Sequence, residues 1–338
     1  MSAADLPHWL VEPLDRLLAM GDAIPHALLI EGPRGVGKGL LAEAFAAALL
    51  CEQPGVRRRA CGACPACGWF SAGNHPDARR LAPAVEDGDG PEGRGERSRH
   101  EIKIDQVRAL ADFIGMGAHR AGRKLVLVDP AHSLNTAAAN ALLKTLEEPE
   151  GRTVFLLVAP TGARLPPTIR SRCVAFAVAP PSRSQALDWL RGRLPEVDPA
   201  ELGRWLDLTN GAPLAAQTLA EPAVAAAHRL LLQAVAAVPE TAALKLAEGF
   251  GPVPAAIWLP QLQGWVSDLA RVCAGAMAQR YPTQAERLGR LAGMTRLDRV
   301  CGLATWLDRQ VPVLEHPLNA RLFAEDAWIR YEALFARD

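Results

Sequence analysis

The sequence predicts an α/β domain with a parallel sheet, followed by a small helical segment and a longer all-helical region. Two observations carry this prediction. Over the first half of the chain, short continuous apolar runs alternate with helical patterns, as in parallel sheets covered by helices on both faces. After the Pro-Pro pair at 180–181, apolar residues recur at helical spacing. We therefore expect three domains, at 1–179, 180–222 and 223–338.

The expected strands of the first domain are short apolar runs bounded by turn residues. They lie at 27–30, 124–129, 153–158 and 174–178. Helices are expected at 40–50 and at 134–148, and Pro149 stops the second one. Segment 86–100 is rich in Gly and charged residues, so we expect a surface loop there. In the small helical segment, a turn at 210–213 separates two expected short helices.

Composition limits the function classes that fit the chain. Its 338 residues contain 37 Lys and Arg and 37 Asp and Glu, so the net charge is zero. A protein that acts mainly by gripping DNA phosphates is more often basic. The N-terminus lacks the pattern of a signal peptide, and no apolar run approaches the roughly 18 residues of a membrane span. We expect a cytoplasmic protein in which clustered cysteines bind metal rather than form disulfides.

Four of the seven cysteines carry the most specific pattern. Cys51, Cys61, Cys64 and Cys67 follow the spacing C-x9-C-x2-C-x2-C. Four thiolates close a tetrahedral shell around zinc, which predicts a structural Zn²⁺ site with no open position for catalysis. A zinc knuckle that reads nucleic acid is the alternative. The arginines at 57–59 support it weakly, because a short charge run is usually just solvated.

A phosphate-loop pattern precedes the cysteines. Gly32, Gly35, Gly37 and Lys38 stand between an expected strand and an expected helix, the context in which backbone N–H groups cradle phosphates. Lys38 is expected to reach the β- and γ-phosphates. Gly39 stands where Ser or Thr normally brings a hydroxyl to Mg²⁺, so one part of the nucleotide site is missing.

The second expected strand shows a similar loss. Asp129 ends this strand, as a metal-binding carboxylate does in nucleotide hydrolases, but Pro130 follows where a Glu would activate water. A general base contributes typically 10²–10⁴-fold in rate. We therefore expect a degenerate site that binds nucleotide weakly or not at all and does not hydrolyse it. The alternative is a loop that survives only to shape the fold.

Two runs of the sequence resemble bacterial clamp-loader subunits, the AAA+ proteins of the DNA polymerase III holoenzyme. These runs are 135–149, which ends in Thr-Leu-Glu-Glu-Pro, and 165–173, which ends in Ser-Arg-Cys. Further similarities lie at 26, 75–77, 104–108 and 316–322. The resemblance implies a RecA-like AAA+ domain with an inserted zinc module, then a helical lid domain and a helical collar domain for oligomerisation. It covers most of the chain and is weaker over 223–338.

Within this family, the departures point to the subunit type that does not hydrolyse ATP. Besides Gly39 and Pro130, Ala159-Pro160 replaces a polar sensor, and the sensor arginine of the second domain is replaced around 213–214. Arg172 is kept. In the family, this arginine is a finger that projects into the ATP site of the neighbouring subunit, where such a group is worth 10³–10⁵ in rate. Its alternative is a surface arginine with a local partner.

The resemblance also implies the setting in which the chain works. Expected partners are gamma/tau and delta subunits, the sliding clamp, and primer-template DNA in the assembled complex, at the replisome in the cytoplasm. We expect no intrinsic ATPase, although the holoenzyme itself synthesises DNA. The rival is an active ATPase subunit of the gamma/tau type, which turnover lost on Lys38→Ala would establish. A zinc-ribbon nucleic-acid binder that acts alone is disfavoured by the zero net charge.

Overall fold

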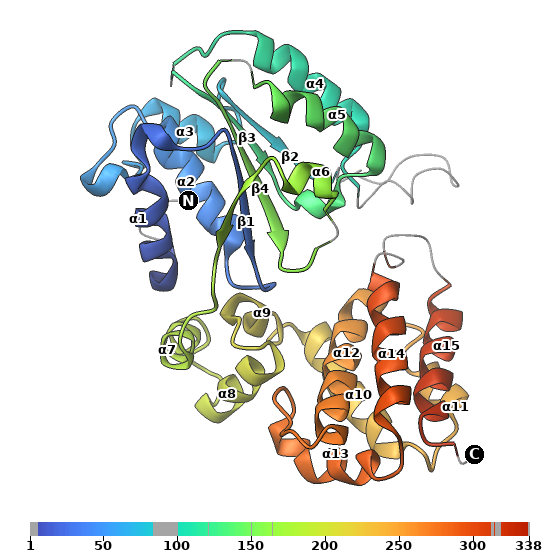
Figure 1. Ribbon diagram of the computed structural model, residues 1–338. Coiled ribbons are helices and arrows are strands. Elements are labelled where there is room, and N and C mark those ends of the chain that lie inside the picture. The colour runs from blue at the N-terminus through green and yellow to red at the C-terminus, as the bar shows by residue number, and fades with distance from the viewer. Residues whose placement is uncertain are drawn as a thin grey trace. The chain divides into compact units, whose positions relative to one another are not determined.

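The computed structural model describes residues 6–83, 101–120, 122–149, 151–163, 165–311, 314 and 319–336. The chain divides into two compact units, 1–181 and 182–338 (Figure 1). The loop expected at 86–100 lies outside the described residues. The further boundary expected at residue 222 stays a prediction.

The first unit is built on a parallel sheet, as predicted. Its strands are β1 Ala27–Gly32, β2 Ala78–Leu81, β3 Lys124–Val128, β4 Thr153–Pro160 and β5 Val174–Ala177, in the order β2-β3-β4-β1-β5. In the register, Leu29 of β1 lies opposite Leu157 on one side and Ala175 on the other. The central strands are buried along nearly their whole length, which is why they appear in the sequence as continuous apolar runs.

Helices cover both faces of this sheet, with α1, α2 and α3 on one side and α4, α5 and α6 on the other (Figure 1). Their bounds are α1 Val11–Ala19, α2 Lys38–Leu50, α3 Pro65–Ser71, α4 Ile104–Gly115, α5 Thr136–Glu147 and α6 Pro167–Arg170. Phe113 of α4, Leu142 of α5 and Phe155 of β4 share one buried cluster. Helix α5 begins two residues later than expected, because the Asn135 side chain caps it by accepting a hydrogen bond from the N–H of Ala138 at 2.8 Å.

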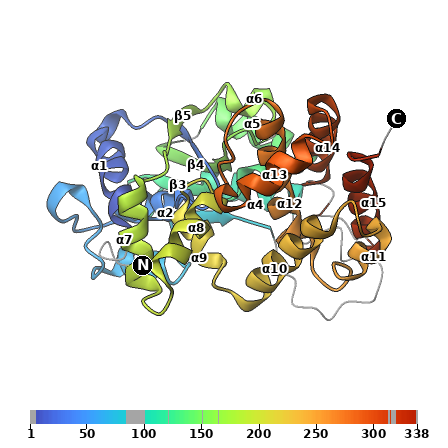
Figure 2. The ribbon, with the colours of Figure 1, turned by 90° about the horizontal axis from the view of Figure 1, so that it is seen from below.

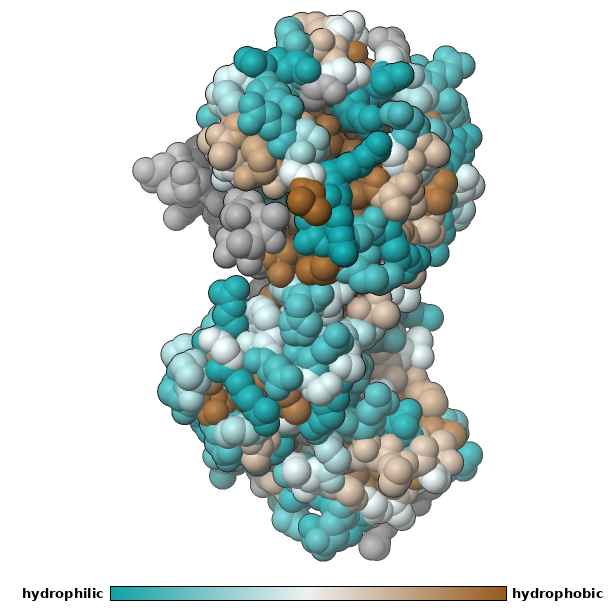
Figure 3. Space-filling view, turned by 90° about the vertical axis from the view of Figure 1, so that its left-hand side faces the viewer, coloured by the Kyte–Doolittle hydropathy of each residue, from teal (hydrophilic) through white to brown (hydrophobic). Residues whose placement is uncertain are grey.

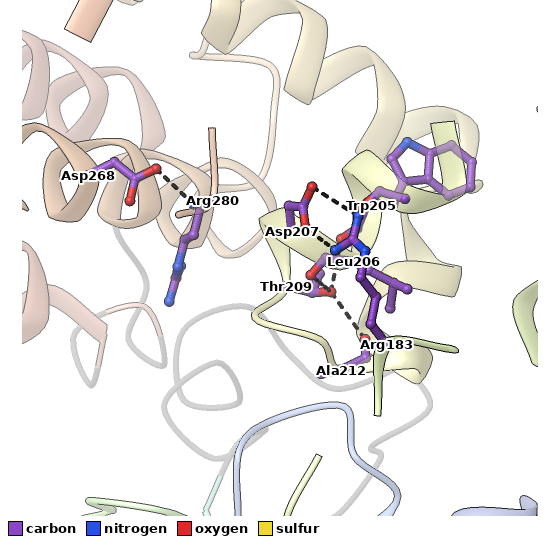
Figure 4. A network of polar contacts seen from close by, with 9 residues as sticks. Arg183, Trp205, Leu206, Asp207, Thr209, Ala212, Asp268 and Arg280 are labelled. Carbon is purple, nitrogen blue, oxygen red and sulfur yellow. Dashed lines mark hydrogen bonds and ion pairs between the residues drawn. The ribbon is translucent and has the colours of Figure 1, made fainter. Parts of the chain in front are cut away.

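The second unit begins with three short helices where two were expected. They are α7 Arg183–Arg193, α8 Pro199–Leu208 and α9 Pro213–Thr218, and they share a hydrophobic cluster of their own. Arg183 joins α7 to α8 by an ion pair with Asp207. The Thr209 hydroxyl donates to the carbonyl of Trp205 at 2.9 Å, at the expected turn between α8 and α9 (Figure 4). This turn is therefore fixed by side-chain hydrogen bonds.

The rest of the second unit is helical, as predicted (Figure 2). Its helices are α10 Pro222–Ala237, α11 Ala243–Glu248, α12 Ala255–Cys273, α13 Ala285–Ala292, α14 Leu297–Gln310 and α15 Ala320–Ala333. Their shared core contains the fully buried Trp258, Trp265 and Trp328. The indole N–H of Trp265 donates to the hydroxyl of Tyr331 at 2.7 Å, which satisfies a polar group inside this core.

A buried carboxylate organises the turn that follows α12. Asp268 is almost completely buried, and its two oxygens accept hydrogen bonds from the backbone N–H groups of Gln279, Arg280 and Tyr281 at 2.7–3.0 Å (Figure 4). The carboxylate thus takes the place of a backbone partner for three consecutive residues. No helix in the described part of the chain has the length and apolar character to cross a membrane.

Candidate nucleotide-binding loop, cysteine cluster and arginine site

The phosphate loop joins β1 to α2, as the sequence predicted. Gly37 has a φ of 97°, which glycine adopts without strain, and it immediately precedes the first residue of α2. A Cβ at Gly32 would lie 2.3 Å from the carbonyl oxygen of Val178, so the strand end has no room for a side chain. The indole of Trp9 donates to the carbonyl of Val36 at 3.0 Å. The N-terminal segment therefore helps to fix the loop through the hydrogen bond from Trp9.

The Lys38 side chain is engaged within the loop itself. The Lys38 ammonium donates to the carbonyl of Pro33 at 2.7 Å, and the residue is only 7% exposed. Burial lowers the pKa of Lys38, an effect that Asp129 opposes. Asp129 lies across from Gly39, where an added Cβ would meet its Oδ2 at 2.7 Å. The carboxylate thus fills the space that a Ser or Thr side chain would need.

Asp129 itself is half-buried. Burial raises the pKa of this carboxyl, and the nearby Glu43 adds to the rise. Arg80 and Lys38 lower the same pKa but do not cancel the effect of burial. The structure therefore brings Lys38 and Gly39 of the loop together with Asp129, and Gly39 supplies no hydroxyl for Mg²⁺.

The four cysteines converge on one point. Their sulfur atoms all lie within 4.8 Å of one another. Cys51 Sγ is 3.9 Å from Cys64 Sγ, and Cys61 Sγ is 4.0 Å from Cys67 Sγ. A tetrahedron with zinc–sulfur bonds of about 2.3 Å has edges of about 3.8 Å, so these spacings fit zinc. The cluster is a site that could hold a metal ion, and its donor set is the one expected from the sequence.

Backbone N–H groups point at the sulfurs of this cluster. The N–H of Cys61 donates to Cys51 Sγ and that of Cys64 to Cys61 Sγ, both at 3.3 Å, and the N–H of Cys67 donates to Cys64 Sγ at 3.5 Å. Burial by itself raises the pKa of the Cys64 thiol, but N–H donors from Cys67 and Glu52 lower it to about 6. Such donors stabilise a thiolate, which is the form that binds a metal.

The cysteine segment is fastened to α1 by one carboxylate. Asp15 accepts from Arg57 at 2.7 Å and from Arg59 at 2.7 and 3.1 Å. Hydrogen bonds from Arg59, and then Arg57, hold the pKa of Asp15 below its usual value against the opposing effect of burial. On this side of the first unit, hydrophilic residues are interspersed with small hydrophobic spots (Figure 3). Two of the three arginines are thus engaged within the chain, which weakens the nucleic-acid alternative.

Arg172 and the phosphate loop lie at opposite ends of the strands. Because all strands are parallel, the loop after β1 and Asp129 after β3 lie at the carboxyl edge. Arg172 lies two residues before β5, whose first residue lies opposite Leu28 near the start of β1. At a rise of about 3.3 Å per residue, the four steps from Leu28 to Gly32 put roughly 13 Å of strand between the start of β5 and the loop. Arg172 therefore cannot serve the nucleotide loop of its own chain.

The immediate partner of Arg172 was not predicted. Its guanidinium forms an ion pair with Glu147, the last residue of α5, and donates to the carbonyl of Thr168 at 2.8 Å. Glu147 belongs to the Thr-Leu-Glu-Glu-Pro run. The sequence signal was a pair of acidic residues at the C-terminal end of an expected helix, where the helix dipole disfavours negative charge.

The fold and the cysteine cluster define an AAA+-like α/β protein. The family model described as "DNA polymerase III, delta subunit" matches residues 10–182, just over half of the chain. The DNA polymerase III subunit delta' of Pseudomonas aeruginosa is 38% identical over 330 residues, covering 91% of this chain and 92% of that protein. The chain therefore belongs to the family of delta' clamp-loader subunits of DNA polymerase III.

Two further relatives agree with this membership. The delta' subunit of Escherichia coli K12 is 37% identical over 230 residues, covering 68% of this chain and 65% of that protein. The tau subunit of Bacillus subtilis is 34% identical over 151 residues, covering 45% of this chain and 24% of that protein. Among solved structures, a gamma-subunit-related protein of Thermotoga maritima has a TM-score of 0.40 at 16% identity, with 96% of this chain and 99% of that chain covered. The predicted resemblance to clamp-loader subunits is confirmed by the family model and the two delta' relatives.

Proposed function

We propose that this chain is a subunit that does not hydrolyse ATP itself and that lends Arg172 to the ATP site of a neighbouring subunit. The placement of Arg172 carries this proposal. It lies at the amino edge of the sheet, about a strand's length from its own phosphate loop. A guanidinium in that place is available only to a nucleotide held by another chain, where it would stabilise the charge that builds on the γ-phosphate.

The state of the chain's own loop supports the same proposal. Gly39 offers no hydroxyl to Mg²⁺, and Pro130 offers no base to a water molecule. Asp129 occupies the space beside Gly39, and Lys38 is bonded to the loop carbonyl of Pro33. Such a loop can shape the fold without turning over a nucleotide.

We further propose that the cysteine cluster holds one structural Zn²⁺. Cys51, Cys61, Cys64 and Cys67 would supply four thiolates, and the sulfur spacings of 3.9–4.0 Å fit a closed tetrahedral shell. A bound zinc would supply no catalysis here, since its four positions would be filled. Metal analysis of the purified chain tests this, with one equivalent of zinc expected per chain and none in Cys64→Ser.

The assembly in which the chain would work follows from the family. We propose that it joins gamma/tau and delta subunits, and that the complex loads the sliding clamp onto primer-template DNA at the replisome in the cytoplasm. The helices of 223–338 would form its part of a collar, and 180–222 its lid domain. Support comes from membership among delta' subunits and from the similarity to a tau subunit.

The test is the DNA- and clamp-stimulated ATPase of the reconstituted loader, with Arg172→Ala in this chain alone. We expect the turnover of the one neighbouring site to be lost while assembly stays unchanged. Arg170→Ala is the matched control, because Arg170 lies two residues away and pairs with Glu31 within the chain. Unchanged turnover with Arg172→Ala would sink the proposal. ATP turnover by the isolated chain, lost on Lys38→Ala, would favour the active-ATPase rival instead.

A further inference from the structure

Arg172 is held by its own chain rather than projecting free. One guanidinium nitrogen, Nη2, forms the ion pair with Glu147. The other, Nη1, donates to the carbonyl of Thr168 at 2.8 Å and to the hydroxyl of Ser171 at 3.4 Å. The Arg172 side chain is 33% exposed and that of Glu147 is 47% exposed, so a phosphate could approach the pair from solvent.

The position of Glu147 at the C-terminal end of α5 is unfavourable for the helix itself. Glu147 is the last residue of α5, and Glu148 caps the helix immediately after it. The C-terminal end of a helix carries partial negative charge, which makes acidic residues unfavourable there. An acidic residue placed where it destabilises its own helix suggests that its side chain has another role. The contact that the structure shows for this side chain is the ion pair with Arg172.

We propose that, in the free subunit, Glu147 holds the Arg172 guanidinium in an ion pair, a state called parking below. Glu147 then competes with the neighbouring subunit's nucleotide for the same guanidinium. This inference rests on the proposed function of Arg172. The N–H groups of Nη1 and Nη2 form the planar fork that recognises a phosphate. Both nitrogens are engaged in the free chain, so the fork must leave Glu147 and Thr168 before it can bind the phosphate in full.

The strength of the ion pair sets the size of the effect. Exposed ion pairs are worth at most about 1 kcal/mol, which corresponds to about fivefold in an equilibrium. An ion pair of this strength competes with weakly bound anions from solution. A triphosphate in a low-dielectric interface attracts the guanidinium more strongly and can therefore displace Glu147. Removal of the carboxylate should therefore change the availability of Arg172 by about two- to fivefold.

The first experiment uses the free subunit and does not depend on ATP. We expect Glu147→Gln to raise the rate at which phenylglyoxal modifies Arg172, measured by peptide mass spectrometry, by about two- to fivefold. Glu148→Gln is the matched control, because it removes the same charge one residue away and Glu148 forms no ion pair in the described part of the chain. Arg170, paired with Glu31, is the internal reference. Equal rates at Arg172 in the two variants would overturn the proposal.

The second experiment uses the reconstituted loader at subsaturating ATP. Glu147→Gln should raise stimulated turnover by up to about fivefold, while Glu148→Gln leaves it unchanged. A loss of turnover like that of Arg172→Ala would overturn parking and make Glu147 a positioning residue of the engaged finger. If instead Arg172→Ala has no effect, the proposed function fails, and the phenylglyoxal rates still decide whether Glu147 holds Arg172.

Discussion

At the scale of single residues, Gly39 and Asp129 decide what the phosphate loop can do. We expect that Gly39→Ser does not create Mg²⁺-dependent ATP binding, because Asp129 Oδ2 already lies 2.7 Å from the position of the new Cβ. Asp129 would have to leave its rotamer, at a cost of about 1 kcal/mol in the free energy of unfolding. Isothermal titration with ATP and Mg²⁺, together with urea unfolding, measures both effects.

The control for this variant is Gly192→Ser in α7. Gly192 has open space around its Cα, so the added side chain should stabilise the helix slightly rather than strain it. Tight Mg²⁺-dependent binding by Gly39→Ser would contradict the prediction, and would mean that one hydroxyl is enough to repair the loop.

Asp268 is the residue with the largest expected effect on the second unit. Its buried carboxylate accepts three backbone hydrogen bonds, and an amide at this place would turn one acceptor into a donor. We expect Asp268→Asn to lower the free energy of unfolding by about 3 kcal/mol, since hydrogen bonds to charged groups contribute about 1.5–3 kcal/mol each. Asp308→Asn is the control, because exposed Asp308 accepts a single bond from Gln263. Equal destabilisation of the two variants would refute this account.

At the scale of elements, the cysteine cluster should decide whether α3 forms. Helix α3 has seven residues, too few to be stable alone, and begins between Cys64 and Cys67. We expect Cys64→Ser, or a chelator that removes the proposed metal, to raise hydrogen exchange in 61–71 to near the rate of an unfolded chain. Exchange in α12 should not change.

Cys301→Ser is the matched control, because Cys301 is exposed and lies outside the cluster. Protected amides at 61–71 in Cys64→Ser would show that packing against α2, rather than the proposed metal, holds the segment.

Three of the four strands that the sequence predicted are buried on both faces, and the fourth, β5, is a largely exposed edge strand that its run of Val, Ala and Phe still revealed. Strands β1, β3 and β4 are apolar runs because helices cover them on either side. Strand β2 was missed, since two of its four residues are arginines and it lies at an edge of the sheet. Propensity and periodicity carry little signal for a short strand that is half exposed.

The candidate sites divide in the same way. The cysteine cluster was predictable because three of its ligands lie within seven residues and spacing alone brings them together. The contact of Arg172 with Glu147 was not, because it depends on the end of α5 and the start of β5 meeting at one edge of the sheet. That meeting is a property of strand order, which the sequence pattern does not reveal.

At the scale of the whole molecule, one buried and two half-buried histidines should make the protein less stable in acid. Burial lowers the pKa of His75, His132 and His228 below the ordinary value of 6.5. Below pH 6.5 the unfolded chain therefore binds more protons at these histidines than the folded chain does. Their contribution to the free energy of unfolding is full above pH 6.5 and is lost as the pH falls below it. Thermal unfolding followed against pH should show a declining midpoint below 6.5.

One variant separates this effect from general acid denaturation. His228→Gln removes one of the three groups and should make the decline of the second unit shallower, whereas His119→Gln, at an exposed position, should leave it unchanged. A pH profile that is identical in the wild type and His228→Gln would rule out the contribution of His228.

The two outermost strands of the sheet, β2 and β5, differ in how easily they could pair with another copy of the free chain. An open strand edge is a template for pairing with another copy, and charged side chains discourage such pairing. Strand β2 carries Arg79 and Arg80 at one edge, whereas β5 exposes about half of Val174 at the other. Self-association of the free chain into aggregates should therefore begin along β5, which makes the colloidal stability of the purified subunit depend on what covers that strand.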